Sequence, residues 1–216
     1  DVETHTLLRL SDVIRQSPDG LPPAGFPYTW GPNQVDYGMD PRIVDDPRFS
    51  GEIIEGLKAL PSVSIVTSMD HMFGAKHGVY SNPGEQGRSS ERPASVELIH
   101  PDGGEGFQVD CGIRIRGGFS RLPINPKHAF RLFFRDEYGP AKLKYPLFGK
   151  DGAQEYDNID LRTFQNYSWS LGGDPRGIFV RDQFNRDLQL AMGQPASRGE
   201  FIHLYINGHY WGIYNT

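Results

Sequence analysis

The sequence predicts a loop-rich α+β or β-rich domain, with mainly antiparallel strands and a few helices, rather than a helical bundle. The strongest observation is a strand–loop–strand pattern over residues 107–135, where apolar and polar residues alternate with the period of two of an extended chain. The composition agrees, because 26 glycines, 17 prolines and 12% aromatic residues favour many turns. Asn207-Gly208 lies between two alternating runs, which indicates a two-residue type I′ hairpin.

The totals are typical of a soluble globular protein. The 216 residues are 37% hydrophobic and 23% charged, enough for one domain with a core, or for one domain with an appendage. The net charge of -5 argues against a general nucleic-acid binder, which is normally basic. No apolar run approaches the ~20 residues that span a bilayer. The chain opens without a signal peptide or initiator methionine, so we expect a processed chain or a piece of a longer one.

Three segments are predicted before residue 40. Residues 1–10 are predicted to form a strand, and residues 11–16 a helical turn capped by Ser11. Residues 17–33 are dense in proline and glycine and have no period, which predicts an irregular segment lying across a domain. We interpret its alternating aromatic residues as packing anchors rather than a sugar-binding platform; they are Phe26, Tyr28 and Trp30.

Short helices and one buried strand are predicted next. Asp40-Pro41 combines a helix N-cap with a proline at the first helical position. The elements that follow are a helix over residues 50–60 ended by Pro61, a buried strand over 62–67, a turn over 70–73 and a polar loop over 78–93.

The stretch from residue 94 to residue 135 is the centre of the prediction. Residues 94–116 are predicted to form a hairpin with a turn at 101–104, and residues 128–135 a further strand. One face of the strand at residues 107–116 is apolar, which predicts that Cys111 packs in the core rather than acting as a reactive thiol. The residues of this face are Phe107, Val109, Cys111, Ile113 and Ile115.

The opposite face of these strands is cationic. On the strand at residues 107–116 it carries Arg114 and Arg116. On the strand at residues 128–135 it carries Arg131 and Arg135, together with Phe133. The loop between the strands, RGGFSRLPINPK, holds two glycines, a serine and three cations. Such a face and loop suit a phosphate-bearing ligand, and the alternative is a hairpin whose arginines are merely solvated.

A strand and the clearest helix follow. The strand is predicted over residues 158–164, and a polar, glycine-rich turn separates it from a helix over residues 178–192. Asp182 and Arg186 are spaced to form an ion pair along this helix. Its apolar stripe consists of Val180, Phe184, Leu188 and Ala191.

The register of the last hairpin follows from its two-residue turn. Ile206 is predicted opposite His209, Leu204 opposite Trp211, and Ile202 opposite Ile213, with all six on one face. The other face is predicted to hold His203, Tyr205, Tyr210 and Tyr214.

Familiar catalytic and metal-binding motifs are not evident. The seven histidines lack zinc-ligand spacing, and His203 and His209 are predicted on opposite hairpin faces. There is no G-x-S-x-G elbow, no Walker A sequence and no G-x-G-x-x-G between a strand and a helix. The aspartates lie in turn contexts, where they cap or bond the backbone. From the residues alone, the phosphate hypothesis for the cationic loop stays open.

An ordered set of segments resembles the CotH family, the spore-coat CotH-like atypical protein kinases, and in particular the large CotH-like proteins of environmental bacteria. The matching segments are LPSVSIVTSMDHMFGAKHGVYSNP, ERPASVELIHPDG, GIRIRGGFSR, PKHAFRLFFRDEYG, LKYPLFG, IDLRTFQNYSW, VRDQFNRDLQLAMG and LYINGHYWGIYNT.

The resemblance implies a divergent protein-kinase-like fold, binding of ATP with Mg or Mn, and phosphoryl transfer to Ser or Thr of a partner protein. The family's strand–loop–strand belongs to the part that covers the nucleotide, and its positions fall on Arg116, Gly117, Ser120 and Lys127. Lys127 is expected to pair with ATP phosphates, as positioned cations do in phosphoryl transfer. Arg131 on the following strand is a further candidate.

Two departures from the family matter. Many relatives carry a second lysine where this chain has His128. The family's catalytic and metal-binding aspartates are expected beyond Thr216, so the catalytic residues stay unknown, no residue here is assigned to a metal, and the fold is expected to be incomplete at its C-terminus. The resemblance therefore predicts a fragment that supplies the nucleotide side of the domain and is inactive alone.

The resemblance also suggests an organisation of the chain. Residues 1–16 resemble the end of a preceding β accessory domain, residues 17–60 are expected to be an irregular linker with short helices, and residues 61–216 the N-terminal part of a CotH kinase-like domain. Such proteins are usually exported, which predicts an extracellular or cell-surface location and protein substrates or coat proteins as partners.

Two other functions remain open. One is a non-catalytic surface or coat assembly module, with the hairpin tyrosines and residues 26–30 as contact surfaces. The other is a carbohydrate-associated module, suggested by the aromatic residues and the accessory-domain resemblance.

Overall fold

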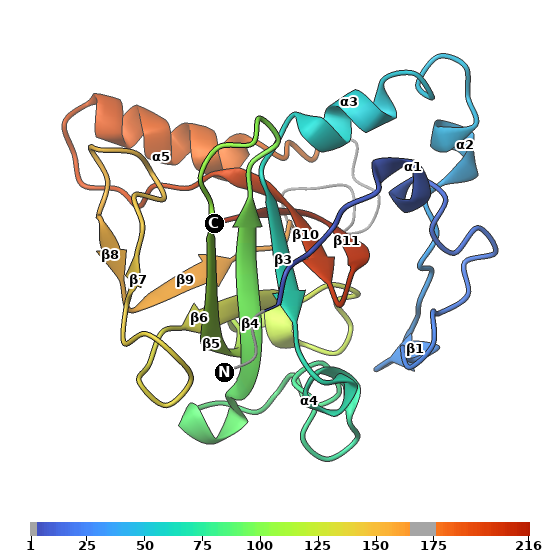
Figure 1. Ribbon diagram of the computed structural model, residues 1–216, viewed down its shortest axis with the longest axis horizontal. Helices are drawn as coiled ribbons and strands as arrows, with labels where there is room; N and C mark the ends of the chain where they lie inside the picture. Colours follow the sequence, from blue (N-terminus) through green and yellow to red (C-terminus); the bar gives the residue numbers. More distant parts are fainter. Residues whose placement is uncertain (1–3, 165–175) are drawn as a thin grey trace.

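The computed structural model describes residues 4–164 and 176–216 and shows an α+β domain built on one large sheet (Figure 1). The seven strands follow the order β11-β10-β3-β4-β5-β6-β9, and every neighbouring pair is antiparallel except β10 with β3. The strands are β3 (Ser62–Val66), β4 (Arg92–Ile99), β5 (Phe107–Arg116), β6 (Ala129–Phe133), β9 (Asn158–Leu161), β10 (Phe201–Ile206) and β11 (His209–Asn215).

Short elements surround this sheet. In the view of Figure 1, α5 and the β7–β8 pair lie on one side of the sheet, and α1, α2 and β1 on the other. The helices are α1 (Leu10–Val13), α2 (Pro41–Val44), α3 (Ile53–Lys58), α4 (Met69–Phe73) and α5 (Arg181–Ala191), with 3-10 turns η1 (Arg88–Ser90) and η2 (Phe119–Arg121). The two small strand pairs are β1 (Thr29–Trp30) with β2 (Asn33–Gln34), and β7 (Leu143–Lys144) with β8 (Glu155–Tyr156).

The sheet curls until its two edge strands meet. Arg162, just after β9, forms a β-bridge with Asn215 of β11, with backbone N–O distances of 2.7 and 2.9 Å in the two directions. The curl encloses one face of the sheet, and the main core fills this interior. Cys111 is fully buried there, which confirms its predicted packing role. The alternation predicted for residues 107–115 is confirmed as well, because all five apolar residues belong to this core or pack against it.

An N-terminal segment covers one end of the core. Phe26 and Trp30 pack against the core together with buried Tyr37, which confirms both as packing anchors. Tyr28 points away and is 68% exposed. The predicted division of the chain at residues 16 and 60 stays a prediction, but these contacts show that the irregular segment is packed onto the sheet.

The predicted first strand is wrong for the residues that the structure describes. Residues 4–9 have no regular structure, and α1 begins at Leu10 without a side-chain cap from Ser11. The segment instead crosses the outer face of the sheet, where Thr4 bonds Ser95 and Thr6 bonds Ser64 through side-chain hydroxyls, each at 2.7 Å. Pairing of its backbone is prevented because β3 and β4 already have strands on both sides.

The first helical turns and the central strands follow the prediction. Asp40 caps α2, since its carboxylate accepts a hydrogen bond from the Arg42 backbone N–H. The helix predicted over residues 50–60 is shorter, at Ile53–Lys58, and the strand predicted over 62–67 is β3. The predicted hairpin is the antiparallel pair of β4 and β5, and the predicted third strand is β6.

The C-terminal hairpin has the predicted turn but a different register. Asn207 and Gly208 have positive φ values of 48° and 79°, as a type I′ turn requires, and Ile206 faces His209. Beyond Tyr205 a bulge shifts the pairing, so that Leu204 faces Gly212 rather than Trp211. The shift turns Tyr214 into the core and leaves Ile213 39% exposed, opposite to the prediction. The bulge depends on Gly212, whose φ of 117° is rarely adopted by other residues.

Helix α5 lies on the seam of the sheet through its polar face. Asp182 pairs with Arg186 at 2.8 Å, as predicted, and also accepts a bond from Arg162 at 2.5 Å. Arg186 reaches Asn215 at 2.5 Å, so the helix bonds both strands of the closing bridge. The apolar stripe points outward instead, since Val180, Phe184 and Leu188 are 52%, 63% and 47% exposed. The glycine-rich turn predicted before this helix lies largely outside the described residues.

Gly112 is the point where Tyr138 crosses β5, and a Cβ at this position would overlap the tyrosine ring. We expect Gly112→Ala to lower the free energy of unfolding by about 1–3 kcal/mol, because the ring or the strand must move. Urea unfolding followed by circular dichroism measures this change. Gly118→Ala is the matched control, since its Cβ would meet nothing within 4 Å, and it should stay within about 0.5 kcal/mol of the parent. Equal stability of the two variants would contradict the close packing of Tyr138.

Candidate functional site

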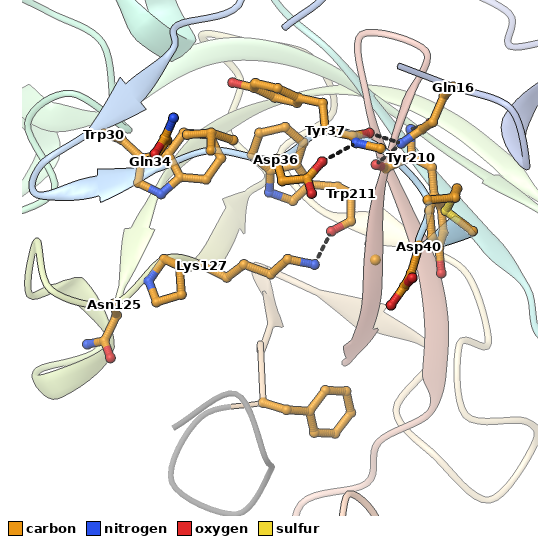
Figure 2. A pocket seen from close by; sticks show the side chains of 16 residues that line it. Gln16, Trp30, Gln34, Asp36, Tyr37, Asp40, Asn125, Lys127, Tyr210 and Trp211 are labelled. Carbon is orange, nitrogen blue, oxygen red and sulfur yellow. Dashed lines mark hydrogen bonds between the residues drawn. The ribbon is translucent and has the colours of Figure 1, made fainter. Parts of the chain in front are cut away.

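Lys127 extends from the loop between η2 and β6 into a cavity of about 370 Å³ (Figure 2). Its ammonium donates a hydrogen bond to the backbone carbonyl of Trp211 at 2.5 Å. The residue as a whole is exposed, but the ammonium end is enclosed, and desolvation lowers the pKa of Lys127 to about 8. A positive charge that is only weakly hydrated is well suited to an anionic ligand.

The bulge in β11 makes room for this ammonium. Gly212 lies directly against Lys127 Nζ, and a Cβ on Gly212 would overlap the nitrogen. The bulge also directs the Trp211 carbonyl towards the lysine while the Trp211 ring stays in the core. One irregularity of the hairpin therefore positions Lys127.

Aromatic rings and two carboxylates line the cavity together (Figure 2). Trp30 and Trp211 have ring centroids 5.4 Å apart, and Tyr37 packs edge-on against Trp30 at 5.9 Å. Asp36 and Asp40 add two carboxylates from the N-terminal segment. A volume of this size and a wall of this kind are typical of small-molecule sites.

The buried hydroxyl of Tyr80 connects two segments that lie next to the cavity. The hydroxyl accepts hydrogen bonds from the His128 backbone N–H at 3.2 Å and from the Trp211 indole at 3.1 Å. Burial raises the pKa of Tyr80 to about 12, so the group stays a neutral hydroxyl at physiological pH. Tyr80 thus ties together the residues on either side of Lys127: the start of β6 and the bulge of β11.

His128, where the resemblance led us to expect a second lysine, is not among the residues that line the cavity. Its Nδ1 donates to the Ser120 carbonyl at 2.7 Å, and its ring lies 4.9 Å from that of Tyr80. Burial lowers the pKa of His128, which favours the neutral ring. This residue fixes the predicted loop rather than adding a second cation to the cavity.

Gly117 and Ser120 shape the loop that leads to Lys127. The Ser120 hydroxyl donates to the Arg116 carbonyl at 2.8 Å. Gly117 has a φ of 103°, and a Cβ there would overlap the Ser120 hydroxyl, so the close turn needs glycine. Binding of a nucleotide by Gly117 and Ser120 stays a prediction.

Arg116 and Arg131 lie on the outer face of the sheet and share one carboxylate. Asp160 of β9 binds Arg116 at 2.7 Å and Arg131 at 2.5 and 2.9 Å. Among the described residues that line the cavity, Lys127 is the one member of the predicted set. The five predicted residues are therefore divided between a cavity, a loop and an outer face.

The acidic and aromatic walls were not among the predicted site residues. Trp30 was predicted as a packing anchor, or as part of a contact surface in the assembly-module alternative, and Asp40 as a helix cap. Asp36 and Tyr37 carry no motif, and the segment lies about ninety residues before Lys127. No local pattern could have placed them beside the lysine.

A second, apolar cavity of about 670 Å³ adjoins the first one at Lys127. It is lined by aromatic and aliphatic side chains, which include Phe164, Phe179, Phe201 and Ile213.

The described residues do not fit a divalent metal ion held by the protein. Within residues 4–164 and 176–216, no three His, Cys, Asp or Glu side chains come close enough to hold one. The two carboxylates of the cavity are engaged already, since Asp36 accepts from the Gly38 N–H at 2.8 Å and Asp40 binds the Arg42 guanidinium. The Arg42 hydrogen bonds lower the pKa of Asp40.

The fold and the site define an α+β domain with a curled sheet and a cavity that Lys127 lines. Comparison with known families indicates which class of protein this is. The family model described as CotH kinase protein matches residues 113–216, from the middle of β5 to the end of β11. This match confirms the predicted resemblance to CotH over these residues, and the family is kinase-like in function. No curated protein matches the chain. No described helix is long and apolar enough to cross a membrane.

Tyr80→Phe tests the support behind the cavity. The change leaves two buried donors, the His128 N–H and the Trp211 indole, without their acceptor, and we expect a loss of about 1–3 kcal/mol in unfolding free energy. Thermal and urea unfolding measure it. Tyr28→Phe, at an exposed ring, is the control and should change stability by less than about 0.5 kcal/mol. If both variants unfold like the parent, the Tyr80 hydroxyl is not a support of the site.

Proposed function

We propose that the protein takes part in ATP-dependent phosphoryl transfer to Ser or Thr of partner proteins, and that this chain supplies the nucleotide side. The CotH match supports a kinase-like function and nucleotide use with a divalent metal at the level of the family. The nucleotide would occupy the cavity that contains Lys127.

The position of Lys127 is the observation that carries this proposal. Its desolvated ammonium bonds the Trp211 carbonyl, and the side chain lines a cavity that is partly walled by aromatic rings. The loop that leads to Lys127 is closed by the Ser120 hydroxyl on the Arg116 carbonyl. A phosphate oxygen of the nucleotide would pair with the weakly hydrated ammonium. The aromatic rings of the wall would pack against the nucleotide base. The attraction between the Lys127 ammonium and a phosphate is strong in such a site, because little water screens the two charges.

The proposal gives no step to Mg or Mn, because the described residues do not fit a protein-held metal. Protein substrates and an extracellular or cell-surface location are proposed from the family, a spore-coat family.

A non-catalytic surface or coat assembly module is the second candidate. The exposed stripe of α5 favours it, because exposed apolar side chains that follow one helix face are common at protein–protein contacts. A carbohydrate-associated module has less support, since Phe26 and Trp30 pack against the core rather than forming an exposed platform.

Nucleotide binding by the complete domain tests the leading proposal. We expect Lys127→Ala to raise the Kd for ATP at least about tenfold, because one charge-assisted contact to phosphate is lost. Isothermal titration with Mg present measures it. Lys150→Ala, at an exposed loop lysine, is the control and should bind like the parent. Equal affinity of the parent and Lys127→Ala would show that the nucleotide does not bind at this lysine.

The lowered pKa of Lys127 predicts an unusual pH dependence. Phosphate binds the charged ammonium, so the Kd for ATP should be nearly constant below pH 7 in this respect. Above pH 8 it should rise about tenfold per pH unit, because the free lysine loses its proton there. Lys127→Arg should remove this rise, since a guanidinium stays charged over the whole range. A parent protein whose Kd does not change between about pH 8 and 9.5 would contradict the enclosed position of the ammonium.

A further inference from the structure

Four arginines lie on the outer face where the end of β5 pairs with β6, and we call this surface the arginine face. They are Arg114 and Arg116 of β5, Arg131 of β6, and Arg135 just after β6. Two carboxylates neutralise part of their charge. Asp160 is shared by Arg116 and Arg131, and Glu91 is shared by Arg114 and Arg135. The four cations and two anions leave a formal surplus of about two positive charges. Glu137 also acts on Arg135, but it is itself paired with Arg88, so the balance is unchanged. The chain as a whole has a net charge of -5.

The strand register places two of these cations directly opposite each other. Arg114 of β5 pairs with Arg131 of β6. Like charges at directly opposite positions destabilise a sheet, so folding alone does not favour this arrangement. The two guanidiniums bind different carboxylates, since Arg131 bonds Asp160 and Arg114 bonds Glu91.

Donor groups remain available on this face. The contact between Arg114 and Glu91 is a single one at 3.4 Å, whereas Arg135 holds the same carboxylate with two bonds of 3.0 Å. The four side chains are 24–35% exposed, so solvent and ligands reach them. Glu91 is fully buried and cannot leave the face.

Phe133 holds two of the guanidiniums in place. Arg114 and Arg135 lie over its ring at 4.4 and 4.9 Å from the centroid. Stacking on an aromatic ring restricts a guanidinium and leaves its edge free for a planar, two-pronged contact. A preorganised guanidinium loses less conformational freedom when it binds an oxyanion.

We propose that the arginine face binds a phosphorylated segment of a partner protein, with the phosphoryl group bridging Arg114 and Arg131. A phosphoserine or phosphothreonine carries about -1.5 to -2 charges, which matches the surplus of the face, whereas one carboxylate would neutralise only half of it. Arginine pairs also match phosphate geometry with two parallel bonds. This site is separate from the Lys127 cavity and does not need a nucleotide.

Fluorescence anisotropy with a labelled peptide tests the proposal. The probe contains one phosphoserine flanked by glutamates, and its unphosphorylated twin is the reference. We expect the complete protein to bind the phosphopeptide at least about tenfold more tightly than the twin, and binding to weaken between about 50 and 300 mM NaCl. Lys127→Ala should leave peptide binding unchanged, which separates this site from the proposed nucleotide site.

Arg114→Gln and Arg131→Gln are the test variants. Each leaves its carboxylate with one arginine, since Arg135 still binds Glu91 and Arg116 still binds Asp160, so both should fold. We expect each to weaken phosphopeptide binding about tenfold. Arg48→Gln, which breaks an exposed ion pair with Asp46 elsewhere, is the matched control and should bind like the parent. Arg114→Lys keeps the charge but should lose most of the preference for phosphate.

Four results would overturn the proposal. They are equal binding of peptide and twin, no loss in either glutamine variant, a loss in Lys127→Ala, and inorganic phosphate that competes at the same concentration as the peptide. The last result would show an anion site without a role for a protein segment.

Discussion

The hydrogen bonds to the Tyr80 hydroxyl are the interaction on which the site depends. One buried oxygen receives the backbone N–H of His128 and the indole N–H of Trp211. These donors belong to the segments that lead into β6 and through the bulge of β11, so the hydroxyl sets their separation. Lys127 lies between them and bonds the Trp211 carbonyl. The side chain that carries the proposed function is thus positioned by a neutral, desolvated hydrogen-bond acceptor.

Closure of the sheet separates two environments with different uses of positive charge. The bridge between Arg162 and Asn215 brings the edges together and encloses the core. Lys127 lies near this seam, where desolvation of its ammonium lowers the pKa of the side chain. The arginines of the outer face keep their charge and are partly hydrated and partly paired. A nucleotide and a phosphorylated segment would therefore be bound by different physical means.

The N-terminal segment contributes both to the core and to the cavity. The CotH match begins at Ile113, yet one wall of the cavity comes from residues 30–40. Trp30 and Tyr37 contribute to the core as well as to this wall, so the segment is held by the same aromatic contacts that shape the cavity.

The sequence by itself determined the local structure and the family. The period of two placed Cys111 in the core, Asn207-Gly208 specified the turn, and ordered segments identified CotH. These properties depend on neighbouring residues, so they could be predicted. Tertiary structure alone decided that a bulge at Gly212 turns Tyr214 inward, that Asp160 pairs with two arginines, and that Lys127 meets Trp211. Lys127 and Trp211 are 84 residues apart, and the curl of the whole sheet brings them together.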